Sequence, residues 1–142
     1  MNDLSNTLVF LFVYGTLMRG FSNRFAQKIA KNAIWIGKGT FTGHLFDLGF
    51  YPGAVYDPNT TSQVHGEVWQ LADFERIIKA LDTYEGVDDK TPEYVRREVP
   101  VLLENGCEMR CWAYIFCQPT ENYEVIMEGD YRKRKYVLKQ QL

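Results

Sequence analysis

Apolar runs separated by glycine-rich loops dominate the pattern of the chain. The first run, Thr7 to Tyr14, is continuously apolar, β-branched and aromatic, which predicts a strand buried on both faces. It stops abruptly at Gly15 to Gly20 (GTLMRG), a segment opened and closed by glycine. The sequence therefore predicts a buried strand that leads directly into a glycine loop.

Two segments have the apolar spacing of amphipathic helices. Ser22 is placed to cap a helix over about residues 23–32. Asp73 is placed to cap a second helix, and Gly86 is placed to end it. The apolar faces consist of Phe25 and Ile29 in the first helix and of Phe74, Ile77, Ile78, Leu81 and Tyr84 in the second.

The other segments are short and extended. Residues 34–48 (IWIGKGTFTGHLFDL) predict either two strands or one long, bent strand, residues 51–55 (YPGAV) a turn, and residues 63–71 (QVHGEVWQL) a strand. A hairpin follows, in which Val95, Val99, Val101 and Leu103 alternate, ENG turns the chain, and Met109 to Cys117 returns. Many short strands with two helices predict an α+β fold, a small, mixed-strand, partly closed β-barrel with helices packed outside. Residues 1–142 form one domain on this interpretation.

Composition and charge narrow the classes of partner. The formal net charge is −2, which gives no electrostatic reason to expect nucleic acid or a membrane surface as a partner. The basic cluster at residues 132–135 (RKRK) is interpreted as a solvated surface. The apolar run at residues 8–14 is too short to span a bilayer and lacks the pattern of a signal peptide, so a cytoplasmic location is expected.

The cysteine count points to the same compartment. Cys107, Cys111 and Cys117 are odd in number and are expected on one face of a strand, as reduced thiols. His44 and His65 show no ligand spacing with them, so no metal site is predicted.

Few residues stand out as candidates for catalysis. No serine lies in a nucleophile-elbow context, and the glycine loop lacks the Lys-Ser/Thr of a phosphate-binding loop. A cysteine–histidine pair stays open. Two acids, Glu67 and Glu85, lie among apolar or aromatic neighbours. Glu85 comes just before Gly86, where a helix carries partial negative charge, so it is either exposed or has a raised pKa.

A series of motifs resembles the γ-glutamylcyclotransferase-like family, which includes γ-glutamylamine cyclotransferases and AIG2-like proteins. The motifs are FVYGTLMRG, YPGAV, VHGEVWQL, LDTYEGV, YVRREVPVLL and CWAYIF, in this order. They extend over roughly Val9 to Phe116, which is most of the chain. YGTL followed some seventy residues later by LDxYEG is the specific part of the resemblance.

The resemblance implies a mixed α/β fold around a short barrel, a cavity at the YGTL loop, and Glu85 as the proton acceptor. The implied reaction is intramolecular: the α-amine of a γ-glutamyl group attacks its own γ-carbonyl and releases 5-oxoproline and an amine or amino acid. The implied partner is thus a small γ-glutamyl molecule, and no metal or organic cofactor is implied. The amides of Gly15, Thr16 and Leu17 would bind a carboxylate or a developing oxyanion. Tyr14 either shapes the pocket or packs in the core.

Two alternatives remain at this point. The same site could remove a γ-glutamyl protecting group from a larger metabolite, or the domain could be a non-enzymatic module that binds a small ligand. An intact Glu85 argues against the second alternative, because a binder needs no base there. The sequence determines neither the leaving group nor the oligomeric state.

Overall fold

The computed structural model describes residues 9–21 and 23–133. Its strands are β1 (Val9–Val13), β2 (Ile34–Asp47), β3 (Pro52–Tyr56), β4 (Gln63–Leu71), β5 (Tyr94–Leu103), β6 (Glu108–Phe116) and β7 (Glu124–Val125). Its helices are α1 (Arg24–Asn32), α2 (Phe74–Glu85) and the short 3₁₀ helix η2 (Tyr131–Lys133). No helix in this described part of the chain is long and apolar enough to cross a membrane.

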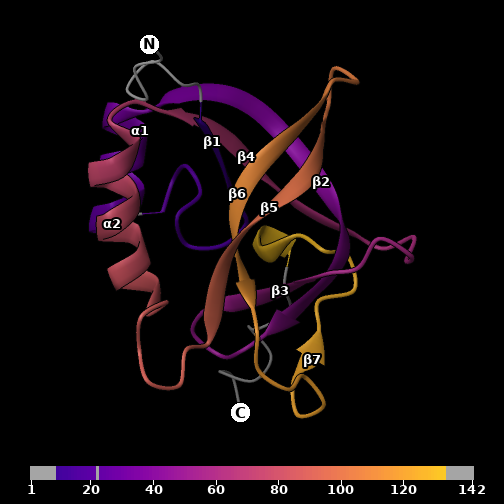
Figure 1. The fold of residues 1–142 in the computed structure, drawn as a ribbon. Coiled ribbons are helices and arrows are strands. Elements are labelled where there is room, and N and C mark those ends of the chain that lie inside the picture. The colour runs from indigo at the N-terminus through magenta and orange to yellow at the C-terminus, as the bar shows by residue number, and fades with distance from the viewer. Residues whose placement is uncertain (1–8, 22, 134–142) are drawn as a thin grey trace.

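The sheet closes on itself to form a barrel (Figure 1). Its strand order is β3-β2-β4-β1-β6-β5, and β2 pairs with β5 as well, through Gly39–Leu103 and Thr40–Leu102. The pairing of β1 with β6 is parallel and the other pairings are antiparallel, so the barrel is mixed. Helices α1 and α2 lie on one side of the barrel (Figure 1). The predicted α+β barrel with outer helices is confirmed, and the β2–β5 seam closes it.

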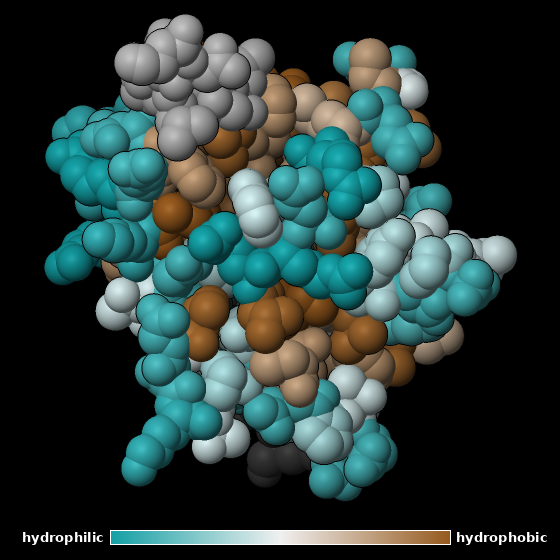
Figure 2. Space-filling model, viewed as in Figure 1, coloured by the Kyte–Doolittle hydropathy of each residue, from teal (hydrophilic) through white to brown (hydrophobic). Residues whose placement is uncertain are grey.

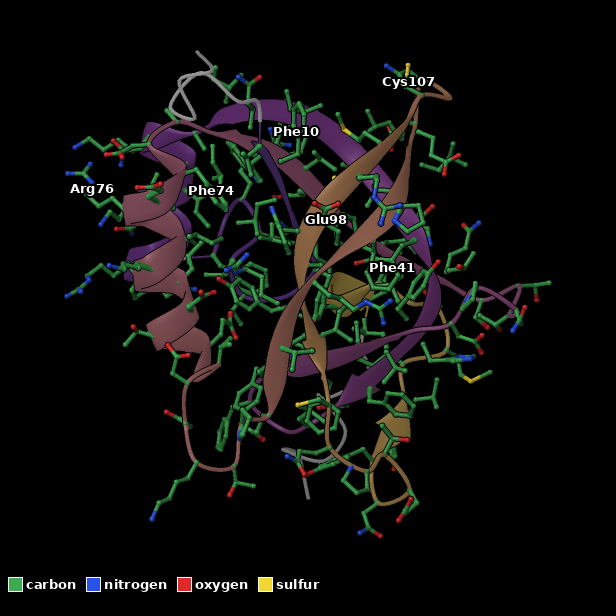
Figure 3. The ribbon with its side chains drawn as sticks, in the orientation of Figure 1. Phe10, Phe41, Phe74, Arg76, Glu98 and Cys107 are labelled. Carbon is green, nitrogen blue, oxygen red and sulfur yellow. The ribbon has the colours of Figure 1, made fainter. Side chains whose placement is uncertain are left out.

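Strand β1 lies between β4 and β6, which explains its apolar sequence. Leu11, Phe12 and Val13 are buried, as expected for a strand covered on both faces. Thr7 and Leu8, the first residues of the predicted strand, lie outside the described residues. Phe41 of β2, labelled in Figure 3, packs edge-on against Phe12. The ring centroids of the two residues are 5.3 Å apart.

Helix α2 buries the predicted face. Ile77, Ile78 and Leu81 are buried, and the helix ends at Gly86, whose φ of 73° suits glycine. Tyr84, which the apolar spacing predicts on the same face, is 46% exposed. In Figure 3, Phe74 points toward the sheet while Arg76 points away from the molecule. Hydrophilic residues follow the outer edge of the helices in Figure 2.

Of the two predicted caps, the first differs in position and the second differs in its hydrogen bonding. The side chain of Asn23 caps α1 by accepting a hydrogen bond from the Ala26 amide, so the cap lies one residue after Ser22, which is outside the described residues. Asp73 occupies the cap position of α2 in a left-handed conformation, and its side chain makes no capping hydrogen bond. It pairs with Arg76 instead, at 3.0 Å.

Three further predictions are corrected or resolved here. Residues 34–47 form one long strand, and YPGAV mostly belongs to β3 rather than to a turn. The turn comes earlier, where the Leu48 amide donates to the Tyr51 carbonyl, and proline can begin a strand because it then needs no ladder donor. Val95 alternates with Val99, Val101 and Leu103, which are buried, but is itself 40% exposed, while its neighbour Tyr94 is buried.

The three cysteines do not share one strand. Cys107 lies in the turn between β5 and β6 (Figure 3), Cys111 is buried in β6, and Cys117 follows β6. All three thiols are free, as predicted.

Candidate active site

A cavity of about 450 Å³ lies where the loop after β1 meets the end of α2. In Figure 1 this loop passes between the helices and the barrel. The cavity is lined by Phe12, Val13, Tyr14, Gly15, Thr16, Leu17, Asn23, Phe50, Tyr51, Pro52, Tyr84, Glu85, Glu93, Tyr94 and Tyr114. It therefore brings together all the residues that the sequence predicts for the site, although about seventy residues separate the loop from Glu85.

Glu85 is the last residue of α2, and its side chain is only partly exposed. Burial, and secondly the negative charge of Glu93, raise its pKa from 4.5 to about 7. Burial among apolar neighbours is one of the causes that the sequence suggests. A carboxylate with this pKa exchanges protons readily at neutral pH, as a general base must.

Glu93 is a second carboxylate in the cavity, and sequence reasoning missed it. It lies just before β5 and accepts a hydrogen bond from the hydroxyl of Tyr51, at 2.7 Å. In the sequence it stands in the polar stretch DDKTPE and carries no pattern that separates it from a surface acid. Only the folding of the β2–β3 turn against the start of β5 reveals its place.

The loop after β1 has a turn at its centre, closed by the Met18 amide donating to the Gly15 carbonyl at 3.0 Å. Within the described residues, the amides of Gly15, Thr16 and Leu17 donate no hydrogen bond to another protein group. The Thr16 carbonyl accepts a hydrogen bond from the side-chain amide of Asn23, so the residue that caps α1 also holds the loop. The loop thus places three backbone N–H groups at the cavity that are free to donate hydrogen bonds to a ligand.

Gly15 is required by its protein neighbours. A Cβ atom at this position would lie 2.8 Å from Cγ of Pro52, closer than real Cβ contacts. Glycine here also leaves room for the close approach of a ligand to the loop amides, so packing against β3 is a second reason for it. Any side chain here would displace the loop or the strand.

Tyr14 both shapes the cavity and packs in the core, which are the two roles that the sequence leaves open. Its ring lines the cavity, while its buried hydroxyl donates to the Tyr114 carbonyl at 2.5 Å and accepts from the Ala54 amide at 3.2 Å. Burial raises the pKa of this phenol far above its ordinary value, so it stays protonated. Tyr14 joins β1 to β3 and β6, and what it presents to a ligand is its ring.

Glu67, the other candidate acid, does not line this cavity. It is 4% exposed, and its Oε1 accepts from the Arg19 amide at 2.6 Å and from the indole of Trp69 at 3.4 Å. Its Oε2 lies 3.3 Å from the guanidinium of Arg132, which also donates to the Arg19 carbonyl. Glu67 and Arg132 therefore fasten the end of the glycine loop to β4 and η2. Sequence reasoning missed Arg132, which it assigned to a solvated cluster.

The chain belongs to the gamma-glutamyl cyclotransferase, AIG2-like family, whose model matches residues 11–133. A protein of Methanocaldococcus jannaschii that is provisionally named a gamma-glutamylcyclotransferase is 32% identical over 125 residues, 87% of this chain and 95% of that one.

Solved structures share the fold. The Bacillus subtilis protein YkqA has a TM-score of 0.70 at 24% identity, over 94% of this chain and 43% of that longer chain. A mouse AIG2-like protein has a TM-score of 0.66 at 24% identity, over 83% of each chain.

Among the described residues, no group of three or more His, Cys, Asp or Glu side chains is arranged to hold a metal ion.

Proposed function

We propose that this protein is a γ-glutamyl cyclotransferase with Glu85 as its general base. Its substrate is a γ-glutamyl amine or γ-glutamyl amino acid, and its products are 5-oxoproline and the free amine. The observation that carries the proposal is a partly buried carboxylate, with its pKa raised to about 7, in one cavity with three uncommitted loop amides. Membership of the family supports the same reaction.

The first step is a proton transfer. The α-amine of a γ-glutamyl group is mostly ammonium at neutral pH and cannot attack a carbonyl. The ionised carboxylate of Glu85 takes one proton, and the freed amine attacks the γ-carbonyl carbon to close a five-membered ring. A positioned base of this kind contributes about 10²–10⁴-fold to the rate.

The second step breaks the amide bond. The carbonyl oxygen carries negative charge in the tetrahedral intermediate, until the bond to the leaving nitrogen breaks and the carbonyl re-forms. Glu85 returns its proton to the leaving nitrogen, and a second proton from the ring nitrogen brings the released amine to its ammonium form. Protons and electrons balance without a redox partner.

The loop amides supply the anion-binding part of the site. Backbone donors from Gly15, Thr16 and Leu17 bind the α-carboxylate of the γ-glutamyl group or the oxygen of the intermediate. Backbone groups suit this role because they add no bulk and are fixed by the fold. Asn23, Glu67 and Arg132 hold the loop in place.

Glu85→Gln tests the proposal directly. The amide has nearly the same size and cannot accept a proton at neutral pH, so turnover should fall by at least about 10²-fold with folding retained. Release of 5-oxoproline from a panel of γ-glutamyl amines and dipeptides is the measurement, with circular dichroism to check folding. Glu75→Gln is the matched control, because Glu75 is exposed on the same helix and should leave turnover unchanged.

Glu67→Gln is not a neutral control, since Glu67 anchors the glycine loop. The sequence predicts a change within about tenfold for this variant, and the structure adds that any change acts through the loop. If Glu85→Gln keeps full turnover, Glu85 is not the base. If the unchanged protein releases no 5-oxoproline from any member of the panel, the cyclotransferase proposal fails.

A further inference from the structure

The charged side chains that line the cavity are all acidic. Of the described lining residues, only Glu85 and Glu93 carry ionisable acids or bases other than tyrosine, and none is Lys, Arg or His. In the proposed reaction Glu85 transfers the protons, and the loop amides bind the α-carboxylate of the substrate. Glu93 then takes no direct part in the reaction, although its negative charge raises the pKa of Glu85.

The carboxylate of Glu93 is held in place and partly available. Its backbone carbonyl accepts from the Cys117 amide at 2.8 Å, which fixes the residue to the end of β6. Its Oε1 accepts from the Tyr51 hydroxyl, while Oε2 accepts no hydrogen bond from the described residues. Glu93 can therefore accept a hydrogen bond from a ligand without breaking its own contacts.

Exposed aromatic side chains line the same cavity as this acid, and one of them, Tyr51, donates a hydrogen bond to it. Phe50 is 94% exposed, Tyr84 is 46% exposed and Tyr51 is 38% exposed, and all three line the cavity. A cavity that combines exposed aromatic rings with a carboxylate favours an alkylammonium group, since the rings attract a cation through their faces and cover its methylene groups.

We propose that the leaving amine carries a second positive charge and that Glu93 binds it. The substrate class is then the γ-glutamyl amides of diamines and related polycationic amines, which deepens the proposed function and rests on it. A γ-glutamyl amino acid would instead bring a second carboxylate into a cavity that already holds two acids. Like charges brought together in this way reduce binding.

Three γ-glutamyl amides of similar length test the proposal: those of 1,4-diaminobutane, pentylamine and 4-aminobutanoate. Their leaving groups differ chiefly in being cationic, neutral or anionic at the far end. The cationic amide should exceed the neutral amide in kcat/KM by roughly five- to tenfold, as for a partly exposed ion pair, and the anionic amide should be slowest. The preference should weaken as salt rises from 0.05 to about 0.5 M, because salt screens exposed charges.

Glu93→Gln should abolish most of this preference. The variant also changes the surroundings of Glu85, but that effect applies to all three amides and cancels in their ratio. Glu98→Gln is the control, because it removes the same charge from β5, outside the cavity. Glu98, labelled in Figure 3, pairs there with Arg110. Its ratio should equal that of the unchanged protein.

Failure of this inference is distinguishable from failure of the proposed function. Equal rates with the three amides, or a faster anionic amide, would overturn the role of Glu93 while 5-oxoproline release still supports the cyclotransferase. A preference that survives in Glu93→Gln would also overturn it. Absence of 5-oxoproline from every γ-glutamyl compound would remove the proposed function, and the inference with it.

Discussion

The carboxylate of Glu85 meets two opposing demands, because it must be ionised to act as a base and must be partly buried to bind substrate. Its pKa of about 7 is the compromise, and burial is the first cause, followed by Glu93. We expect kcat/KM to rise with pH through an acid limb near pH 7, as the carboxylate becomes ionised. In Glu93→Gln the limb should move to lower pH, because a neighbouring negative charge is lost. A pH–rate profile of both proteins checks this, and an unmoved limb would show that Glu93 does not influence the base.

The same residue should reduce stability at neutral and higher pH. Below pH 4.5 Glu85 is protonated in both the folded and the unfolded chain, so it imposes no penalty. Between pH 4.5 and about 7 the unfolded chain ionises Glu85 while the folded chain keeps it protonated, so the folded state loses up to ~3 kcal/mol relative to a neutral side chain over this range, and the penalty stays constant at higher pH. Glu85→Gln should therefore be more stable than the unchanged protein at pH 8, with a smaller gap at pH 5. Urea unfolding at both pH values measures the gap, and an equal gap would contradict the raised pKa.

At the scale of elements, α2 is fixed to the barrel one turn before Glu85. Asp82 accepts from Nε of Arg96 at 2.8 Å and from the Tyr114 hydroxyl at 2.7 Å, which joins the helix to β5 and β6. The side chains of Asp82 and Arg96 are 17% and 23% exposed, so solvent screens this ion pair only in part. Because α2 ends at Glu85, these contacts position the carboxylate as well as the helix.

Asp82→Asn should lower the free energy of unfolding by about 2 kcal/mol, since hydrogen bonds to charged groups contribute about 1.5–3 kcal/mol and the amide retains only part of them. Asp73→Asn is the matched control on the same helix. Asp73 pairs with Arg76 at the surface, with side chains 57% and 77% exposed, so the change should stay within about 0.5 kcal/mol. Thermal or urea unfolding compares the two variants. Equal losses would mean that the buried network holds α2 no better than a surface pair.

The same scale shows which parts of the site the sequence could predict. Apolar periodicity predicts β1, α2 and β4 because each pattern is local, and Gly86 ends α2 for a local reason. The residues that hold the loop depend on contacts that no local pattern contains. Arg132 reaches the Arg19 carbonyl across 113 residues, so a basic cluster near the C-terminus gave no sign of this contact. YPGAV was assigned to a turn because Pro and Gly favour turns, whereas pairing with β2 makes it a strand.

At the scale of the whole molecule, the barrel depends on a short seam. The sequence predicts the strands and a partly closed barrel, but the closing pair is set by how the long β2 bends, and that bend depends on tertiary packing. Only two residue pairs join β2 to β5, and Gly39 belongs to one of them. A Cβ atom on Gly39 would lie 2.8 Å from Cγ1 of Val101 and 3.1 Å from the Leu102 carbonyl oxygen. The backbone oxygen cannot move aside without opening the seam.

Gly39→Ala should therefore destabilise the protein by ~1–3 kcal/mol, the usual cost of overfilling a packed site. Gly39 does not line the cavity that holds Glu85, so the folded variant should keep its kcat/KM at 25 °C. Urea unfolding measures the loss, and hydrogen exchange should show faster opening of β2 and β5 near residues 39–40 and 102–103 than in the unchanged protein. An unchanged unfolding midpoint would mean that the seam accommodates the methyl group freely. A loss of kcat/KM with the fold intact would mean instead that closure of the barrel is coupled to the shape of the cavity that holds Glu85.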